Sequence, residues 1–339
     1  MRAAVYREQG RVDITDVPRP ELGENDVLVE VSHCGICGTD LHMVVDGWGR
    51  ADSIGGHEYA GTVHAVGPAV SDWRPGARVV ARPQSEGCGR CAHCQARRPS
   101  LCDARGRPGI DLFQGAFAEY VRVDRRQLVA LPDDLSLRHA ALAEPLAVAL
   151  HAVTVAEGPA DARALVSGGG PIGALIAALL LSGGASEVVV SEPGKERRAL
   201  ARRLGATAVA PTALVSPALP FDCIDHPFEI AFECSGRADA VRAALAQLAR
   251  GGRLVLVGTG LEQPPLDANR VLLNELTITG AFNYDAGGFE RAIEILAAGG
   301  ISADLLLEPG EVPLEGMLEA MEDLAAGATA GKVLVTPRG

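Results

Sequence analysis

The chain has 339 residues, a length that predicts two domains rather than a single core. Its formal net charge of −12 argues against nucleic acid and anionic membranes as partners. Apolar residues make up 47%, yet no run is long enough to span a membrane, and the N-terminal segment lacks the apolar region of a secretory leader. We therefore expect a globular cytoplasmic protein.

The first 150 residues have the pattern of short strands separated by Gly and Pro turns, which is typical of a compact β-barrel-like domain. A helical run is expected over 138–153. The expected strands are 2–6, 27–31, 61–66 and 78–81.

Two segments between these strands contain possible zinc ligands. The first runs from Cys37 to His42 with the sequence CGTDLH, and the second begins Gly56-His57-Glu58. Taken alone, each has an ordinary interpretation as a core cysteine or a hydrogen-bonded turn.

Four cysteines follow within a 15-residue stretch and have the spacing C-x₂-C-x₂-C-x₇-C: Cys88, Cys91, Cys94 and Cys102. Thiolates this close together can complete a tetrahedral shell around one Zn²⁺, as in structural zinc sites. Disulfides or isolated buried thiols are the alternative, and a reducing compartment disfavours the disulfides. The spacing therefore predicts a structural zinc lobe.

From residue 164 onwards, strands alternate with helices, the pattern that builds a parallel sheet. The whole chain is therefore expected to be an α/β protein, with a doubly wound parallel sheet after the barrel. Segment 210–226 is short and rich in proline, and we assign no element to it. Further strands are expected at 187–191, 229–233, 253–257, 276–280 and 332–336, and further helices at 238–248, 289–298 and 314–326.

Gly168, Gly170 and Gly173 form a G-x-G-x-x-G motif between a predicted strand and a predicted helix. In that context the motif binds a dinucleotide. The first glycine allows a tight turn, the second lets the backbone approach the pyrophosphate, and the third lets helix and strand pack closely. Pro171 and Ile172 begin the helix, whose N-terminus offers free N–H groups to the phosphates.

Glu192 lies 19 residues after Gly173, at the end of the next predicted strand. A carboxylate there can accept hydrogen bonds from both hydroxyls of the adenosine ribose and repels a 2′-phosphate, so NAD is expected rather than NADP. Arg197 is expected beside the cofactor. Together with Lys195 and Arg198 it can offset that repulsion, or the three can form the exposed face of the next helix.

These features together resemble the zinc-dependent medium-chain dehydrogenases, nearest to their sorbitol and threonine dehydrogenase branch. The segment from Gly56 matches the zinc signature of that family, and the likeness continues to residues 331–333. It implies a GroES-like catalytic domain formed by 1–147 and 284–339, and a Rossmann NAD-binding domain formed by 148–283. It also implies a homo-oligomer, either a dimer or a tetramer.

The resemblance implies a second, catalytic zinc with Cys37, His57 and Glu58 as its ligands. Alcohol dehydrogenases of the family supply a second cysteine, but this chain has none between 102 and 223. It has Glu144 in an E-P-L-A-V segment instead. In the sorbitol and threonine branch that carboxylate lies near the metal, where it can hold the zinc-bound water or exchange with Glu58.

The resemblance also implies a mechanism for oxidising a small secondary alcohol with NAD, of the polyol, amino-polyol or hydroxy-amino acid type. Zinc acts as a Lewis acid on the substrate hydroxyl, and the cofactor accepts the hydride. Thr39 takes the hydroxyl proton, which the cofactor ribose and His42 carry to solvent. Asp40 orients His57 through the ring N–H.

Two other classes of protein share this fold: a non-catalytic scaffold or sensor that binds zinc and a dinucleotide, and a zinc-free quinone-reductase-like enzyme. The complete set of catalytic residues disfavours the first, and the two metal motifs disfavour the second. Trp48, Leu112 and Phe113 are candidates for the pocket lining, with ordinary loop packing as the alternative. The substrate itself is left open.

Overall fold

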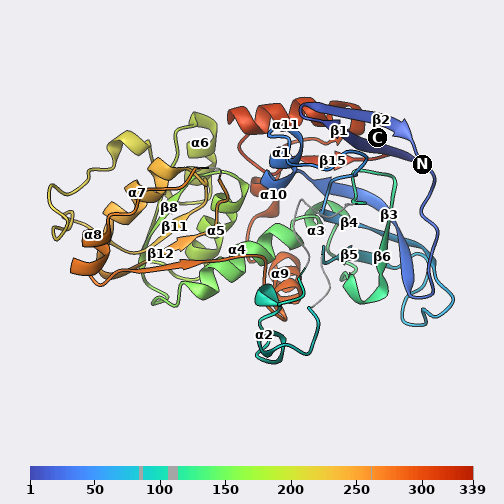
Figure 1. The fold of residues 1–339 in the computed structure, drawn as a ribbon, viewed down its shortest axis with the longest axis horizontal. Helices are drawn as coiled ribbons and strands as arrows, with labels where there is room; N and C mark the ends of the chain where they lie inside the picture. Colours follow the sequence, from blue (N-terminus) through green and yellow to red (C-terminus); the bar gives the residue numbers. More distant parts are fainter. Residues whose placement is uncertain (84–86, 106–113, 261, 339) are drawn as a thin grey trace.

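The structure is a computed structural model that describes residues 1–83, 87–105, 114–260 and 262–338. Two units lie side by side, one built on a largely antiparallel sheet and the other on a parallel sheet (Figure 1). Both chain termini lie at the far end of the antiparallel unit (Figure 1). The predicted α/β fold with a barrel-like and a Rossmann unit is confirmed.

The barrel-like unit has a two-stranded sheet, β1 (Arg2–Glu8) with β2 (Arg11–Asp16), and a seven-stranded sheet in the order β14-β15-β3-β4-β5-β7, with β6 added to β3. Because β14 and β15 come from the end of the chain, the C-terminal segment completes the N-terminal sheet. The strands of the larger sheet are β3 (Asp26–Gly35), β4 (Glu58–Val66), β5 (Arg78–Ala81), β6 (Tyr120–Asp124), β7 (Leu128–Ala130), β14 (Val312–Pro313) and β15 (Leu334–Thr336).

The other sheet is parallel throughout, in the order β10-β9-β8-β11-β12-β13. Ala164 and Val166 of β8 belong to the core on the side of helix α5 (Pro171–Ser182), whereas Leu165 belongs to the core on the side of α7 (Ala238–Ala246). A strand buried on both faces reads as the continuous apolar run seen here. The strands are β8 (Arg163–Ser167), β9 (Glu187–Ser191), β10 (Thr207–Val209), β11 (Phe228–Glu233), β12 (Leu248–Leu256) and β13 (Thr277–Gly280).

The strand order reverses between β8 and β11, and in open α/β sheets ligands bind at such a switch point, beyond the carboxyl ends of the strands. The glycine motif follows β8 directly, so the topology places it at this crevice. A Cβ atom on Gly168 would lie 3.1 Å from the backbone nitrogen of Ser235, which follows β11. The two loops are therefore in close contact.

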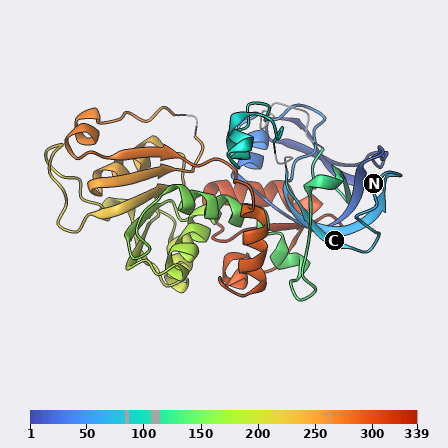
Figure 2. The same cartoon turned by 90° about the horizontal axis from the view of Figure 1, so that it is seen from below.

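Helix α4 (Ala143–Val155) joins the two units and packs against both α5 and α9 (Gly288–Ala297) (Figure 2). None of the helices in the described part of the chain has the length and apolar content needed to cross a bilayer. The remaining helices are α1 (Gly38–Val44), α2 (Ala92–Gln95), α3 (Leu137–Ala140), α6 (Lys195–Arg203), α8 (Ala268–Leu273), α10 (Ala303–Leu306) and α11 (Met317–Ala326).

Two segments have less helix than a chain of this pattern would form. The helix expected over 138–153 is interrupted at residues 141–142, which separate α3 from α4. Segment 210–226 forms only the 3₁₀ turn Pro211–Ala213. Buried Arg270 holds that segment by donating to the carbonyls of Pro220 and Asp222, so its backbone groups find partners without a helix. The domain boundaries at 147/148 and 283/284 stay predictions.

Candidate active site

The predicted catalytic ligands meet where β3 ends and β4 begins. Cys37 occupies the N-cap of α1, His57 precedes β4, and Glu58 pairs across the ladder with Gly35. The Cys37 sulfur, a ring nitrogen of His57 and a carboxylate oxygen of Glu58 all lie within 4.8 Å of one another. Gly35 leaves the room this needs, because a Cβ there would lie 2.4 Å from Glu58 Oε2.

Asp40 ties together the two loops that carry these ligands. Its Oδ2 accepts from the N–H of Cys37 at 2.9 Å, and its Oδ1 accepts from the N–H of Gly56 at 3.2 Å. Oδ1 lies 3.8 Å from His57 Nδ1, which is too long for the predicted hydrogen bond to the imidazole. In this structure Asp40 positions His57 through the backbone and through charge.

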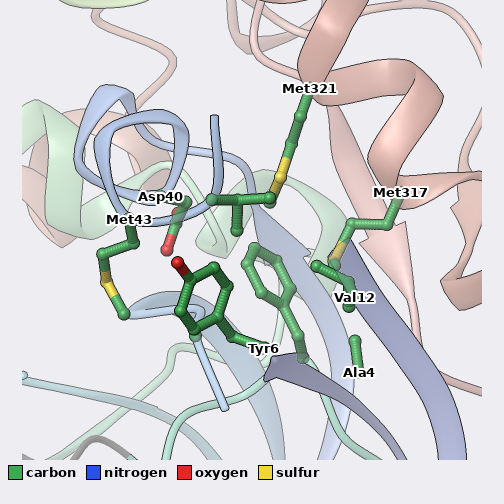
Figure 3. Close-up of a pocket in the computed structure, with 10 residues that line it drawn as sticks. Ala4, Tyr6, Val12, Asp40, Met43, Met317 and Met321 are labelled. Carbon is green, nitrogen blue, oxygen red and sulfur yellow. The ribbon is translucent and has the colours of Figure 1, made fainter. Parts of the chain in front are cut away.

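A small apolar pocket lies on the other side of Asp40, and Tyr6, Met43, Met317 and Met321 are among the residues that line it (Figure 3). Met317 and Met321 belong to α11, which contacts α1. This packing keeps water from the carboxylate, and burial raises the pKa of Asp40.

Lys332 is a site residue that the sequence analysis did not identify. Its ammonium group is 2% exposed and donates to Glu58 Oε1 at 2.8 Å and to the carbonyl of Ile36 at 3.1 Å. Burial alone lowers the pKa of Lys332, but Glu58 and Cys37 outweigh it and raise the pKa overall. The available signal was a single lysine within the apolar C-terminal run.

Glu144 faces the same cluster from the first turn of α4 and is buried. Burial raises its pKa to about 7, the charge of His57 opposes that rise, and the charge of Glu58 adds to it. Burial by itself lowers the pKa of His57, but the Cys37 thiolate and Asp40 raise it well above its usual value. The cluster therefore concentrates negative charge out of water.

A zinc ion fits this cluster. One thiolate, one imidazole and one carboxylate are ordinary zinc donors, and three protein ligands are the usual number at a catalytic site. Glu58 Oε2 is buried and accepts no hydrogen bond. It lies 2.6 Å from Lys332 Nζ, so that contact is an ion pair without hydrogen-bond geometry. A metal cation would give this oxygen a partner and offset the buried negative charge.

The four clustered cysteines also have the arrangement that zinc requires. Their sulfur atoms lie within 4.8 Å of one another, and all eight cysteines of the chain are free thiols. Backbone N–H groups donate to the sulfurs of Cys88, Cys91 and Cys102 at 3.3–3.5 Å. Hydrogen bonds from the backbone of Arg90 and Cys91 lower the pKa of Cys88 to about 6, which favours the thiolate.

Asp285, between β13 and α9, docks the cysteine lobe against the junction of the two units. Its carboxylate accepts from Arg98 Nε and from the Ser100 hydroxyl, both at 2.7 Å. His151 of α4 is buried and lies 3.6 Å from the same carboxylate. The lobe is thus fixed to the helix that carries Glu144.

The predicted proton-path residues both lie in α1, between the catalytic ligands and the parallel-sheet unit. Thr39 Oγ1 lies 3.8 Å from the Cys37 sulfur. His42 reaches the parallel-sheet unit, with Nε2 3.4 Å from Thr259 Oγ1. Trp48 stacks on the imidazole and is 45% exposed. The other two candidates for the pocket lining, at 112 and 113, lie outside the described residues.

The glycine motif has the geometry that a dinucleotide turn requires. Gly168 has φ +99°, which an L side chain rarely adopts, and a Cβ on Gly173 would lie 1.9 Å from the Gly168 carbonyl oxygen. Gly170 caps α5, with Pro171 in its first turn, and a Cβ on Gly170 would lie 4.0 Å from Arg197 Nη1, within ordinary contact distance. Ile172 packs partly against the core. The helix N-terminus can therefore receive a pyrophosphate.

Glu192 is buried beside this turn, and its two oxygens accept from the N–H groups of Gly169 and Gly194, each at 2.7 Å. The carboxylate is thus held where ribose hydroxyls would approach. Arg197 donates to the carbonyls of Leu324 and Thr329 near the end of α11, and its Nη1 lies 4.0 Å from the position of a Cβ on Gly170. It links α6 to the barrel-like unit, and its contact with the cofactor stays a prediction.

Two further glycine turns at the crevice escaped the sequence analysis, one after β11 and one after β12. A Cβ on Gly236 would lie 2.0 Å from the Thr259 carbonyl oxygen, and one on Gly260 would lie 1.8 Å from the Gly236 carbonyl oxygen. Only glycine permits this approach. The signal was present as the C-S-G and G-T-G tripeptides that follow predicted strands.

Comparison with known proteins agrees with this geometry. Residues 23–133 match the alcohol dehydrogenase GroES-like domain, and residues 171–298 match the zinc-binding dehydrogenase domain. An L-threonine 3-dehydrogenase of Streptomyces coelicolor is 34% identical over 95% of both chains. A sorbitol dehydrogenase of Bacillus subtilis is 32% identical over 95% of this chain and 93% of its own.

A solved structure of similar shape comes from Sinorhizobium meliloti 1021. That protein is assigned as a zinc-binding dehydrogenase with NADP bound, and it superposes with a TM-score of 0.87 at 34% identity over 99% of both chains. The chain described here belongs to the zinc-dependent medium-chain dehydrogenases. It is an oxidoreductase, and nothing in these comparisons favours the non-catalytic alternative.

We expect two zinc ions per chain in the purified protein, measured by elemental analysis. Cys37→Ala should lose one zinc together with turnover, because it removes a ligand of the catalytic set. Cys94→Ala should also lose one zinc, but with a larger loss of stability, because a structural metal contributes folding free energy. Retention of both zincs by Cys37→Ala would show that the catalytic ligand set is wrong.

Lys332→Met should lower the free energy of unfolding by about 3–5 kcal/mol in the presence of a chelator, because it leaves Glu58 as a buried, unpaired carboxylate. Urea unfolding of wild-type and variant protein in the same chelating buffer measures the difference. Exposed Lys195→Met is the matched control and should change stability by less than about 0.5 kcal/mol. Equal stability of both variants would mean that the ion pair contributes nothing.

Proposed function

We propose that the protein oxidises a secondary alcohol whose neighbouring carbon carries a hydroxyl or amino group, with NAD as hydride acceptor. The observation that carries this proposal is the pair of buried carboxylates, Glu58 and Glu144, beside one thiolate and one imidazole at the cleft. Relatives named for L-threonine, sorbitol and butanediol share such a vicinal polar group, which supports the substrate class.

In this proposal Cys37, His57 and Glu58 hold the catalytic zinc, and the four clustered cysteines hold a structural one. When bound, zinc supplies a Lewis acid for the substrate hydroxyl and NAD supplies the hydride acceptor. Thr39 accepts the hydroxyl proton at Oγ1, and His42 passes a proton to solvent at the rim of the cleft. Glu144 orients a water or the second polar group of the substrate.

The charge around the site supports these roles. Lys332 forms an ion pair with the Glu58 carboxylate, which limits how far that ligand can move. Burial raises the pKa of Glu144, and the charges of His57 and Lys332 oppose that rise, so its ionised form gains from a nearby cation. We therefore assign Glu58 the ligand role and Glu144 the role nearer to the substrate.

We also propose a homo-oligomer, dimer or tetramer, in the cytoplasm. Within the described part of the chain, β13 is an edge strand of the parallel sheet, and α8 before it exposes Leu272 and Leu273 to 71% and 51%. Apolar side chains beside an unpaired edge favour association with a second copy. Eight free thiols are consistent with a reducing compartment.

A panel of alcohols assayed with NAD and NADP tests the proposed activity. We expect turnover of vicinal diols or 2-amino alcohols to exceed that of simple secondary alcohols of the same chain length. Glu144→Gln is the control that assigns turnover to this site, and its kcat should fall at least about tenfold. Faster turnover of simple alcohols, unaffected by Glu144→Gln, would contradict the substrate class.

Cofactor preference should depend on Glu192, and the ratio of kcat/KM for NAD and NADP measures it. Glu192→Gln keeps an oxygen that can accept from Gly169 and removes the charge, so it should shift the ratio toward NADP by about tenfold. Glu192→Ala should shift the ratio similarly and also weaken both cofactors, because the turn loses its acceptor. An NADP preference in the wild-type enzyme would contradict the assignment.

A further inference from the structure

The imidazole of His42 is held by three contacts, two from the segment that follows α1 and one from the parallel-sheet unit. Nδ1 lies 2.6 Å from Oδ2 of Asp46, four residues later. Trp48 stacks on the ring with centroids 4.6 Å apart and planes 18° apart. Nε2 lies 3.4 Å from the hydroxyl of Thr259, which belongs to the parallel-sheet unit. The ring therefore bridges the cleft in a fixed orientation.

We propose that Asp46 is a positioning residue for proton release, forming a dyad with His42 at the solvent end of the cleft. The proposal rests on the proposed function, since it assumes that His42 handles the proton from the alcohol. Asp46 touches neither substrate nor cofactor in this assignment. It acts on His42, and Trp48 keeps the ring plane in place.

The dyad fixes which ring nitrogen carries the proton. An ionised carboxylate at 2.6 Å accepts a hydrogen bond, so Nδ1 is the protonated nitrogen and Nε2 keeps a lone pair. That lone pair points to Thr259 and the crevice where a ribose hydroxyl would lie. Without Asp46 the two tautomers compete, and the one with Nε2–H cannot accept a proton from the cleft.

The proton balance of the step is simple. His42 accepts one proton at Nε2 from the hydroxyl that faces it, and the resulting imidazolium is stabilised by Asp46 at Nδ1. It then returns one proton to bulk water, because the side chain is 21% exposed. No charge accumulates over the cycle, and no further reactant is required.

An ordinary surface pair at i,i+4 is the competing interpretation, since such pairs contribute only a few tenths of a kcal/mol. Two observations favour a functional role. The ring is stacked on Trp48, and its Nε2 faces Thr259 of the parallel-sheet unit. Of the described side chains that contact the imidazole, Asp46 is charged, whereas Trp48 and Thr259 are neutral.

Asp46→Asn tests the proposal in the zinc-loaded, full-length enzyme. The amide can donate to Nδ1 and so favours the wrong tautomer. We expect kcat for alcohol oxidation to fall about tenfold near pH 7, and the deficit to shrink as the pH rises and solvent base replaces His42. Zinc content and the KM for NAD should stay within twofold of wild type. Added imidazole buffer should restore part of the lost rate.

Two further variants make the result specific. Asp52→Asn is the matched control, because exposed Asp52 lies in the same loop but pairs with Arg7, and it should leave the pH profile unchanged. His42→Gln should lose more activity than Asp46→Asn, and adding Asp46→Asn to it should cost nothing further, since the two residues act as one unit.

An Asp46→Asn enzyme with the wild-type pH profile and no response to imidazole would overturn the dyad. Multiplicative losses in the double variant would overturn it too. If the variant is too unstable to assay, the ¹⁵N chemical shifts of His42 in the wild type test the dyad instead. We expect them to show a proton on Nδ1, and a proton on Nε2 would contradict the proposal. Wild-type protein without any alcohol turnover would instead refute the proposed function.

Discussion

The structure depends on a small volume of buried negative charge at the end of β3. The partly exposed Cys37 sulfur and the buried carboxylates of Asp40, Glu58 and Glu144 converge there, and anions cannot be buried without compensation. Backbone N–H groups compensate Asp40, and Lys332 compensates one side of Glu58. The remaining charge is matched to a divalent cation, which explains why the elements around it converge on one point.

The two sheets supply different parts of the active site, and a few side chains fix the position of one unit against the other. The barrel-like unit presents the donor set, while the switch point of the parallel sheet presents glycine turns that leave room for a dinucleotide. Arg197, Asp285 and His42 each connect segments of the two units, Asp285 through its ion pair with His151 of α4. The site at the junction thus depends on packing that neither unit provides alone.

Much of this could be predicted from the sequence because the relevant signals are local. The cysteine spacing, the glycine motif and the Cys37 and His57 segments each lie within a few residues and imply their own geometry. Contacts that join distant segments could not be predicted. Lys332 reaches Glu58 across 274 positions, and Arg197 reaches Leu324 of α11 across 127.

Short elements were missed for a related reason. Helix α1 contains only Gly38–Val44, too few residues to show helical periodicity, although it carries the proton-path residues. Asp40 illustrates the same limit at the level of one residue. Its position next to Cys37 suggested a partner for His57, but the tertiary fold commits its oxygens to two backbone N–H groups first.

Anomalous X-ray diffraction from crystals of the wild-type protein at the zinc absorption edge is the most direct test of the central claim. We predict two peaks per chain, one enclosed by the four sulfurs of the cysteine lobe and one bounded by Cys37, His57 and Glu58 with Glu144 nearby. A single peak in the lobe, with Glu58 still paired only to Lys332, would contradict a metal-based active site.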